Sequence, residues 1–146
     1  MPLRIDVKAG EKFTLNNSKM HLTKSSALII EDRVVFLRDR DKLSAEQAST
    51  AAKRIYYACQ QMYIDERNFD YHYILFKASC MSFAEAAPSF GPLLLNLGAL
   101  IANGQYLKAL RVSRHLVELE ESLSTVPEGE LLDRVFREAA SYALQD

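Results

Sequence analysis

The hydrophobic period of this chain changes once, and that change constrains the fold more than any other feature. Before residue 43 the apolar residues tend to alternate with polar ones, as in Leu3, Ile5 and Val7, which is typical of strands with one face on a core. From about Ser44 they recur every three to four positions, which gathers them into one helical stripe. The sequence therefore predicts an α+β fold, with a short N-terminal antiparallel β segment of about four strands followed by a bundle of about five helices.

The same change predicts how the chain is organised. Residues 1–42 are expected to form a β-rich N-terminal segment, and residues 43–146 a helical bundle that is one compact unit. The chain is 146 residues long and 49% hydrophobic, which is about the size of one ordinary domain and enough apolar material to bury a core. Disorder throughout the chain is excluded.

Two turn signals divide the β segment. Ala9-Gly10 and Asn16-Asn17 interrupt the alternation, and Gly and Asn accept positive φ at little cost. Apolar runs further along the segment predict the later strands: they are Leu28–Ile30 and Val34–Leu37.

A capping box predicts the start of the first helix. Ser44 is followed three residues later by Gln47, so the hydroxyl and the amide can each bond the other residue's backbone N–H. The helix should run from Ser44 to about Asp65. Its apolar stripe consists of Ala48, Ala51, Ala52, Ile55, Ala58, Cys59 and Met62.

The rest of the chain continues the helical pattern. A second helix is predicted within residues 69–87, which Pro88 ends, from the spacing of Tyr71, Ile74, Leu75, Ala78, Met81 and Ala84 or Glu85. Further helices are expected over residues 90–103, from about Gln105 onward, and after a second capping box at Thr125 and Glu128. The last one is amphipathic and suits docking into a partner or a second copy of the chain, so a homo-oligomer stays open.

No catalytic or metal-binding pattern is present. His21, His72 and His115 lie far apart and lack the HxxxH spacing of a metal site, and Cys59 and Cys80 each lie in an apolar helical stretch, which indicates buried thiols. No glycine-rich phosphate loop occurs. We therefore expect no enzyme, no metal and no cofactor.

The apolar runs do not favour a membrane protein. The longest, residues 92–102, is interrupted by Asn96 and is shorter than the roughly 20 residues that span a bilayer. Met1-Pro2-Leu3-Arg4 leads into polar residues rather than an apolar signal sequence. A soluble cytoplasmic protein is the expectation.

Charge is distributed unevenly along the chain. Residues 1–42 contain nine Lys or Arg against six Asp or Glu, whereas residues 68–146 contain six against ten. An anionic partner is therefore expected at the N-terminal end. The alternative, a solvated face with interspersed acids, stays open. The candidate RNA-binding residues in this region are Arg4, Lys8, Lys12, Lys19 and Arg38.

The first helix carries a second candidate surface. Its run Lys53-Arg54-Ile55-Tyr56-Tyr57 places cations and phenol rings in adjacent turns, where they can pair with phosphates and stack on unpaired bases. This adds Lys53, Arg54 and Tyr57 to the RNA-binding candidates. In the competing interpretation Ile55 and Tyr56 are core residues and the two cations are ordinary surface side chains.

Several runs of this chain occur together in one known family. They are Met1–Ile5, Lys8–Lys12, Phe36–Arg38 before Asp41–Leu43, Ala51–Tyr56 with Gln60, Met62 and Tyr63, Ala86–Pro88, and Gly104 and Tyr106 with Lys108–Leu110. In this order and spacing they resemble the flagellar biosynthesis repressor FlbT family over about residues 1–121. Two positions depart from the family pattern: Ala51 stands where Pro is usual, and Gln61 replaces an apolar residue.

The resemblance implies a post-transcriptional regulator of flagellin synthesis. Such a protein associates with the 5′ untranslated region of flagellin mRNA and limits its translation or lifetime, together with the small partner regulator FlaF. The family brings no catalytic residues. The alternative from another class is a protein-binding adaptor or chaperone that acts on flagellin or FlaF through the helical bundle.

Overall fold

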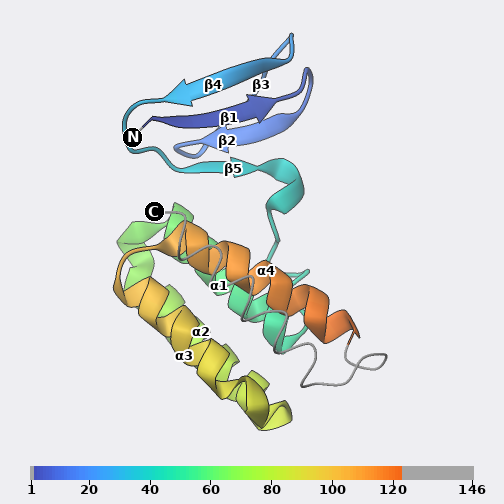
Figure 1. Ribbon diagram of the computed structural model, residues 1–146, viewed down its shortest axis with the longest axis vertical. Coiled ribbons are helices and arrows are strands. Elements are labelled where there is room, and N and C mark those ends of the chain that lie inside the picture. The colour runs from blue at the N-terminus through green and yellow to red at the C-terminus, as the bar shows by residue number, and fades with distance from the viewer. Residues whose placement is uncertain (1, 123–146) are drawn as a thin grey trace. The chain divides into compact units, whose positions relative to one another are not determined.

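The structure, a computed structural model, describes residues 2–122 and divides between Lys42 and Leu43 into two compact units. The first unit contains five strands, and the described part of the second contains four helices (Figure 1). The predicted α+β class is confirmed. The expected terminal helix, with its capping box at Thr125 and Glu128, lies outside the described residues.

Two small antiparallel sheets make up the β unit. In one sheet β1 (Leu3–Val7) pairs with β4 (Ser26–Ile30), and in the other β2 (Lys12–Leu15) lies between β3 (Ser18–His21) and β5 (Phe36–Arg38). The prediction of about four strands is one short because it omits β3. All residues of β3 are exposed except the half-buried Met20, so this strand has no alternating apolar pattern to detect.

The predicted turns form as expected. Asn16 and Asn17 have φ angles of 49° and 68°, the left-handed pair that a two-residue hairpin turn requires. Gly10, with φ of 78°, lies in the turn after β1. The core of this unit contains Val7, Phe13 and Leu37.

The first helix begins later than the capping box predicts. The box itself is present: the Ser44 backbone N–H donates to Gln47 Oε1 at 2.9 Å, and the Gln47 backbone N–H donates to Ser44 Oγ at 3.3 Å. These bonds close a turn rather than start a helix. α1 is Ala51–Ile64, and its N-cap is Thr50, whose hydroxyl accepts from the Lys53 backbone N–H at 3.2 Å.

A buried side chain explains why the segment before α1 is not helical. Gln60 in α1 is 1% exposed, and its amide holds both backbone groups of Leu43. The Leu43 N–H donates to Gln60 Oε1 at 2.8 Å, and Gln60 Nε2 donates to the Leu43 carbonyl at 2.9 Å. The chain at Leu43 is thereby held beside the middle of α1, which prevents it from extending the helix along its own axis.

The other described helices agree with the predicted ranges. They are α2 (Phe69–Ala86), α3 (Gly91–Ala102) and α4 (Tyr106–Ser122). α1 packs against both α2 and α4. The start of α1 lies beside the end of α4, because the Ala52 backbone N–H donates to Glu120 Oε2 at 3.2 Å. The largest fully buried core side chains of the helices come from α1, α3 and α4: they include Ile55, Met62, Leu93, Leu97, Leu110 and Leu116.

α2 buries a different face from the one that its apolar spacing marks. Most of the residues that predicted this helix, namely Tyr71, Ile74, Ala78, Met81 and Glu85, are exposed, and Leu75 and Ala84 are half-buried. The buried residues of α2 are His72, Phe76, Ser79 and Phe83. An apolar stripe on this helix therefore points to solvent.

Candidate nucleic-acid interface

The three candidate residues of α1 lie on one side of that helix. Lys53 and Tyr57 are half-buried and Arg54 is exposed, and their spacings of three and four residues place them on adjacent turns. Ile55 and Tyr56 belong to the core, with 0% and 6% of their surface exposed. The two interpretations of this run are thus compatible, because the core residues and the candidate residues lie on different sides of the helix.

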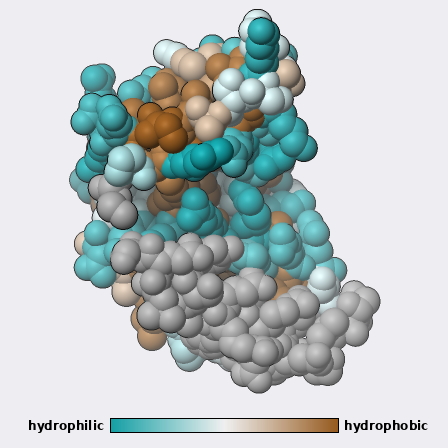
Figure 2. All heavy atoms as spheres, turned by 45° about the horizontal axis from the view of Figure 1, so that its top comes forward, coloured by the Kyte–Doolittle hydropathy of each residue, from teal (hydrophilic) through white to brown (hydrophobic). Residues whose placement is uncertain are grey.

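Ion pairs neutralise several candidate cations of the β unit. Arg4 Nε lies 3.3 Å from Asp6 Oδ1, and Lys19 Nζ lies 3.4 Å from Asp39 Oδ2. Figure 2 shows hydrophilic side chains spread over this unit, with apolar surface open between them. A surface ion pair holds its cation only weakly, so phosphate could still compete for Arg4 and Lys19.

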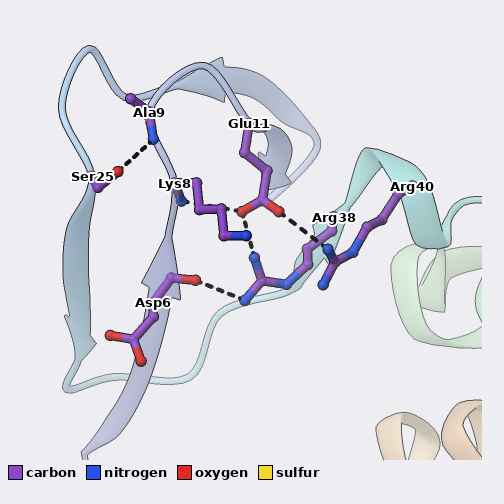
Figure 3. Close-up of polar contacts among 7 residues, drawn as sticks. All are labelled: Asp6, Lys8, Ala9, Glu11, Ser25, Arg38 and Arg40. Atoms are coloured by element: carbon purple, nitrogen blue, oxygen red, sulfur yellow. Dashed lines mark hydrogen bonds and ion pairs between the residues drawn. The ribbon is translucent and has the colours of Figure 1, made fainter.

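Arg38 is held far more firmly. Its Nη1 lies 2.6 Å from Glu11 Oε1, and its Nη2 donates to the Asp6 carbonyl at 3.0 Å (Figure 3). Arg40 Nη1 lies 3.6 Å from the other oxygen of Glu11, and the Lys8 backbone N–H also donates to this carboxylate. Because β5 contributes Arg38 and β1 contributes Asp6, the network joins the two sheets and gives Arg38 a structural role.

Lys8 and Lys12 are the candidates of the β unit whose side chains form no ion pair within residues 2–122. Both are exposed. The β2–β3 register places Lys12 opposite His21, a neighbour that the sequence analysis missed because it missed β3.

Backbone contacts bring a further cation to the same part of the unit. Gly10 N–H donates to the Leu22 carbonyl at 2.9 Å, and Ala9 N–H donates to Ser25 Oγ at 3.0 Å. The turn after β1 therefore lies beside the connection that contains Lys24, which is exposed. We call Lys8, Lys12, His21 and Lys24 the basic end of the β unit.

The described residues contain no cluster typical of a metal centre. No group of three His, Cys, Asp or Glu side chains in residues 2–122 could hold a metal ion. His72 Nε2 lies 2.9 Å from Asp65 Oδ2 at the junction of α1 and α2, and His72 is 7% exposed. This pair connects the end of α1 to α2.

The two thiols have the character of packing groups. Cys59 is buried, and Cys80 is half-buried rather than fully buried. Burial raises the pKa of both thiols, that of Cys80 to about 12. Thiols protonated to this extent are poor nucleophiles and poor metal ligands. Within the described part of the chain, no helix is both long and apolar enough to cross a membrane.

Comparison with known proteins places the chain in a family. The family described as "Flagellar protein FlbT" matches residues 3–124. A probable flagellum biosynthesis repressor protein FlbT of Caulobacter sp. (strain K31) is 30% identical over 124 residues, which is 83% of this chain and 95% of the relative. The corresponding proteins of Rhodopseudomonas palustris (strain TIE-1) and Bradyrhizobium diazoefficiens are 32% and 34% identical, over 84% of this chain and over 98% and 85% of their own lengths.

No solved structure matches the chain. The resemblance seen in the residue runs is confirmed, since the family match extends over most of the sequence. The chain belongs to the FlbT family of flagellar proteins.

Proposed function

We propose that this chain represses flagellum biosynthesis by binding the 5′ untranslated region of flagellin mRNA and controlling its translation or stability. Membership of the FlbT family, whose relatives are described as flagellum biosynthesis repressors, supports the repressor role. The observation that supports RNA binding is a pair of cationic surfaces whose Lys and Arg side chains form no ion pair with the residues that the structure describes: the basic end of the β unit, and Lys53 with Arg54 on α1. The protein would meet its message in the cytoplasm.

The two surfaces suit different parts of a single-stranded leader. On α1, Tyr57 is half-buried with Lys53 and Arg54 beside it, so a base can stack on the phenol while phosphates contact the cations. At the basic end, Lys8, Lys12 and Lys24 can follow the backbone. We do not assign this role to Arg38, because its guanidinium already donates to Glu11 and to the Asp6 carbonyl.

The first experiment measures binding of a flagellin leader at several salt concentrations. If Lys8, Lys12, Lys24, Lys53 and Arg54 each contact a phosphate, log K should fall with log salt with a slope of about −3.5, at roughly 0.7 per contact. The Lys53→Ala/Arg54→Ala double variant should reduce the slope by about 1.4 and keep its helical circular dichroism. A scrambled leader tests whether recognition is specific.

A charge-matched control separates local contacts from net charge. Lys77 and Arg111 are exposed on α2 and α4, outside both surfaces, so the Lys77→Ala/Arg111→Ala variant removes two cations and should keep the original slope. If this variant and the Lys53/Arg54 variant weaken binding equally, the assignment of the α1 surface is wrong. Equal affinity for the leader and its scrambled form would refute specific recognition.

The second candidate function is a protein-binding adaptor or chaperone that acts on flagellin or FlaF. The observation that favours it is the pairing of Arg4, Lys19 and Arg38 with acids, which leaves fewer cations for a polyanion. Co-purification with either protein, together with no measurable affinity for the leader, would decide for the adaptor.

A further inference from the structure

The outer face of α2 presents an apolar stripe to solvent. Tyr71, Ile74 and Met81 are 73%, 63% and 67% exposed, and Ala78 between them is exposed as well. The residues of α2 that pack on the rest of the bundle lie on the opposite side. Exposed apolar side chains that adjoin one another, rather than occurring singly, are typical of an interaction surface.

The spacing of this stripe is that of a coiled-coil seam. Tyr71, Ile74, Ala78 and Met81 follow one another at intervals of three, four and three residues, the alternation of a and d positions in a heptad. Tyr71 and Ala78 then occupy a positions, and Ile74 and Met81 occupy d positions. We call these four residues the α2 seam.

Charged residues stand four positions beyond each end of the seam. Glu85 lies four residues after Met81, near the end of α2, whereas Arg67 lies four residues before Tyr71 in the 3-10 turn Glu66–Asn68 that directly precedes α2; both are exposed. Lys77, the cation nearest the middle of the seam, has its ammonium 4.9 Å from the centre of the Tyr73 ring. Tyr73 does not belong to the seam, so this contact holds the Lys77 charge to one side of it.

An antiparallel two-fold arrangement would make this seam complementary to itself. Antiparallel helices pair each a position with a d position of the other helix. Tyr71 would then lie against Met81 of a second copy, Ile74 against Ala78, and Arg67 against Glu85. Large side chains meet small or flexible ones, and opposite charges meet at both ends. A parallel pair would instead place Arg67 against Arg67 and Glu85 against Glu85.

We propose that this chain forms an antiparallel two-fold dimer with a second copy of itself through the α2 seam, with Arg67–Glu85 ion pairs at its two ends. The proposal is independent of RNA binding, because none of the seam residues belongs to either cationic surface.

The first test compares two substitutions of exposed apolar residues by Glu. Ile74→Glu places carboxylates in both central layers and should raise the dimer dissociation constant by at least about 100-fold. Leu95→Glu makes the same change at a residue of α3 that is 78% exposed but lies outside the seam, and should leave the constant unchanged. Sedimentation velocity over a concentration series measures both.

Charge exchange at the ends of the seam provides a second test that does not depend on core packing. Arg67→Glu or Glu85→Arg alone should weaken the dimer by about 10-fold, because each change creates two like-charge layers. The double variant Arg67→Glu/Glu85→Arg should regain the original affinity. An equimolar mixture of the two single variants should form a heterodimer more readily than either forms a homodimer.

Three results would overturn the proposal. The first is a chain that stays monomeric up to about 100 μM, which would leave the seam to another occupant, such as residues 123–146 of the same chain or a different protein. The second is a dimer that Ile74→Glu and Leu95→Glu weaken equally. The third is a double charge variant that remains as weak as the single variants.

Discussion

The Arg38 network offers the sharpest test of which cations have structural roles. Arg38→Met keeps most of the aliphatic stem but removes the guanidinium, which lies 2.6 Å from Glu11 Oε1 and 3.0 Å from the Asp6 carbonyl. The Arg38 and Glu11 side chains are only 20% and 18% exposed, so the remaining carboxylate would be poorly solvated. The substitution should therefore destabilise the β unit.

The expected cost follows from these contacts. Removing one partner of a fully buried ion pair costs about 3–5 kcal/mol, but the partial exposure of both groups reduces this. Arg40 also remains 3.6 Å from Glu11 and screens part of the charge that is left. We expect a loss of about 2 kcal/mol, which corresponds to roughly 30-fold more frequent opening.

Hydrogen exchange followed by mass spectrometry measures this loss within the β unit. Amides of β1, β2 and β5 should exchange roughly 30-fold faster in Arg38→Met, while peptides from α1 and α4 serve as an internal reference. Arg4→Met is the matched control. Its ion pair with Asp6 is exposed, at 70% and 78% for the two side chains, so its effect should stay below about 0.5 kcal/mol. Equal exchange in the two variants would refute the structural role of Arg38.

Three further predictions concern the helical unit. Burial raises the pKa of the Cys80 thiol to about 12, so less thiolate is present at pH 8 than for an ordinary thiol of pKa about 9, although each thiolate is a stronger nucleophile. The Cys80 thiol should therefore react with a disulfide reagent at pH 8 roughly 30- to 60-fold more slowly than that ordinary thiol, and denaturant should remove the difference. Hydrogen bonds from His72, and then from Asn68, lower the pKa of Asp65. This carboxylate therefore stabilises the fold at pH values above its unfolded pKa, and the stabilisation is lost as the pH falls through the lower folded pKa. Urea titrations should show that Asp65→Asn is destabilising at neutral pH and nearly neutral in strong acid. Gln60→Ala leaves both backbone groups of Leu43 without their amide partner and should lower the free energy of unfolding by about 2–3 kcal/mol, measured by circular dichroism.

The sequence predicted the ends of the second and third helices well, because a single Pro or Gly residue determines where each of them stops. Pro88 ends the second predicted helix, and Gly104, with φ of 74°, follows the third. The start of α1 was wrong for a tertiary reason. Gln60 lies 17 positions from Leu43, and nothing in the local sequence shows that its amide will hold the backbone of that residue. The capping box at Ser44 formed as predicted but capped only a turn.

The candidate interface was predictable in part. The cations of residues 1–42 are evident from the sequence, but their pairing is not, because Glu11 and Arg38 meet only when strands 27 positions apart come together. His21 could be placed opposite Lys12 only once β3 was known. On α2, apolar periodicity identified the helix but not its buried side, since periodicity alone does not distinguish a core stripe from a seam for a second copy.

The single carboxylate of Glu11 also constrains how this protein can vary. It accepts from the backbone of Lys8 and from Arg38, and Arg40 approaches it as well. A neutral residue at position 11 alone would leave the Arg38 guanidinium without its counter-ion, and a neutral residue at position 38 alone would leave the carboxylate without its own. Substitutions at positions 11 and 38 are therefore expected to occur together, either removing both charges or exchanging their signs. Arg4, by contrast, can be substituted without a compensating change elsewhere.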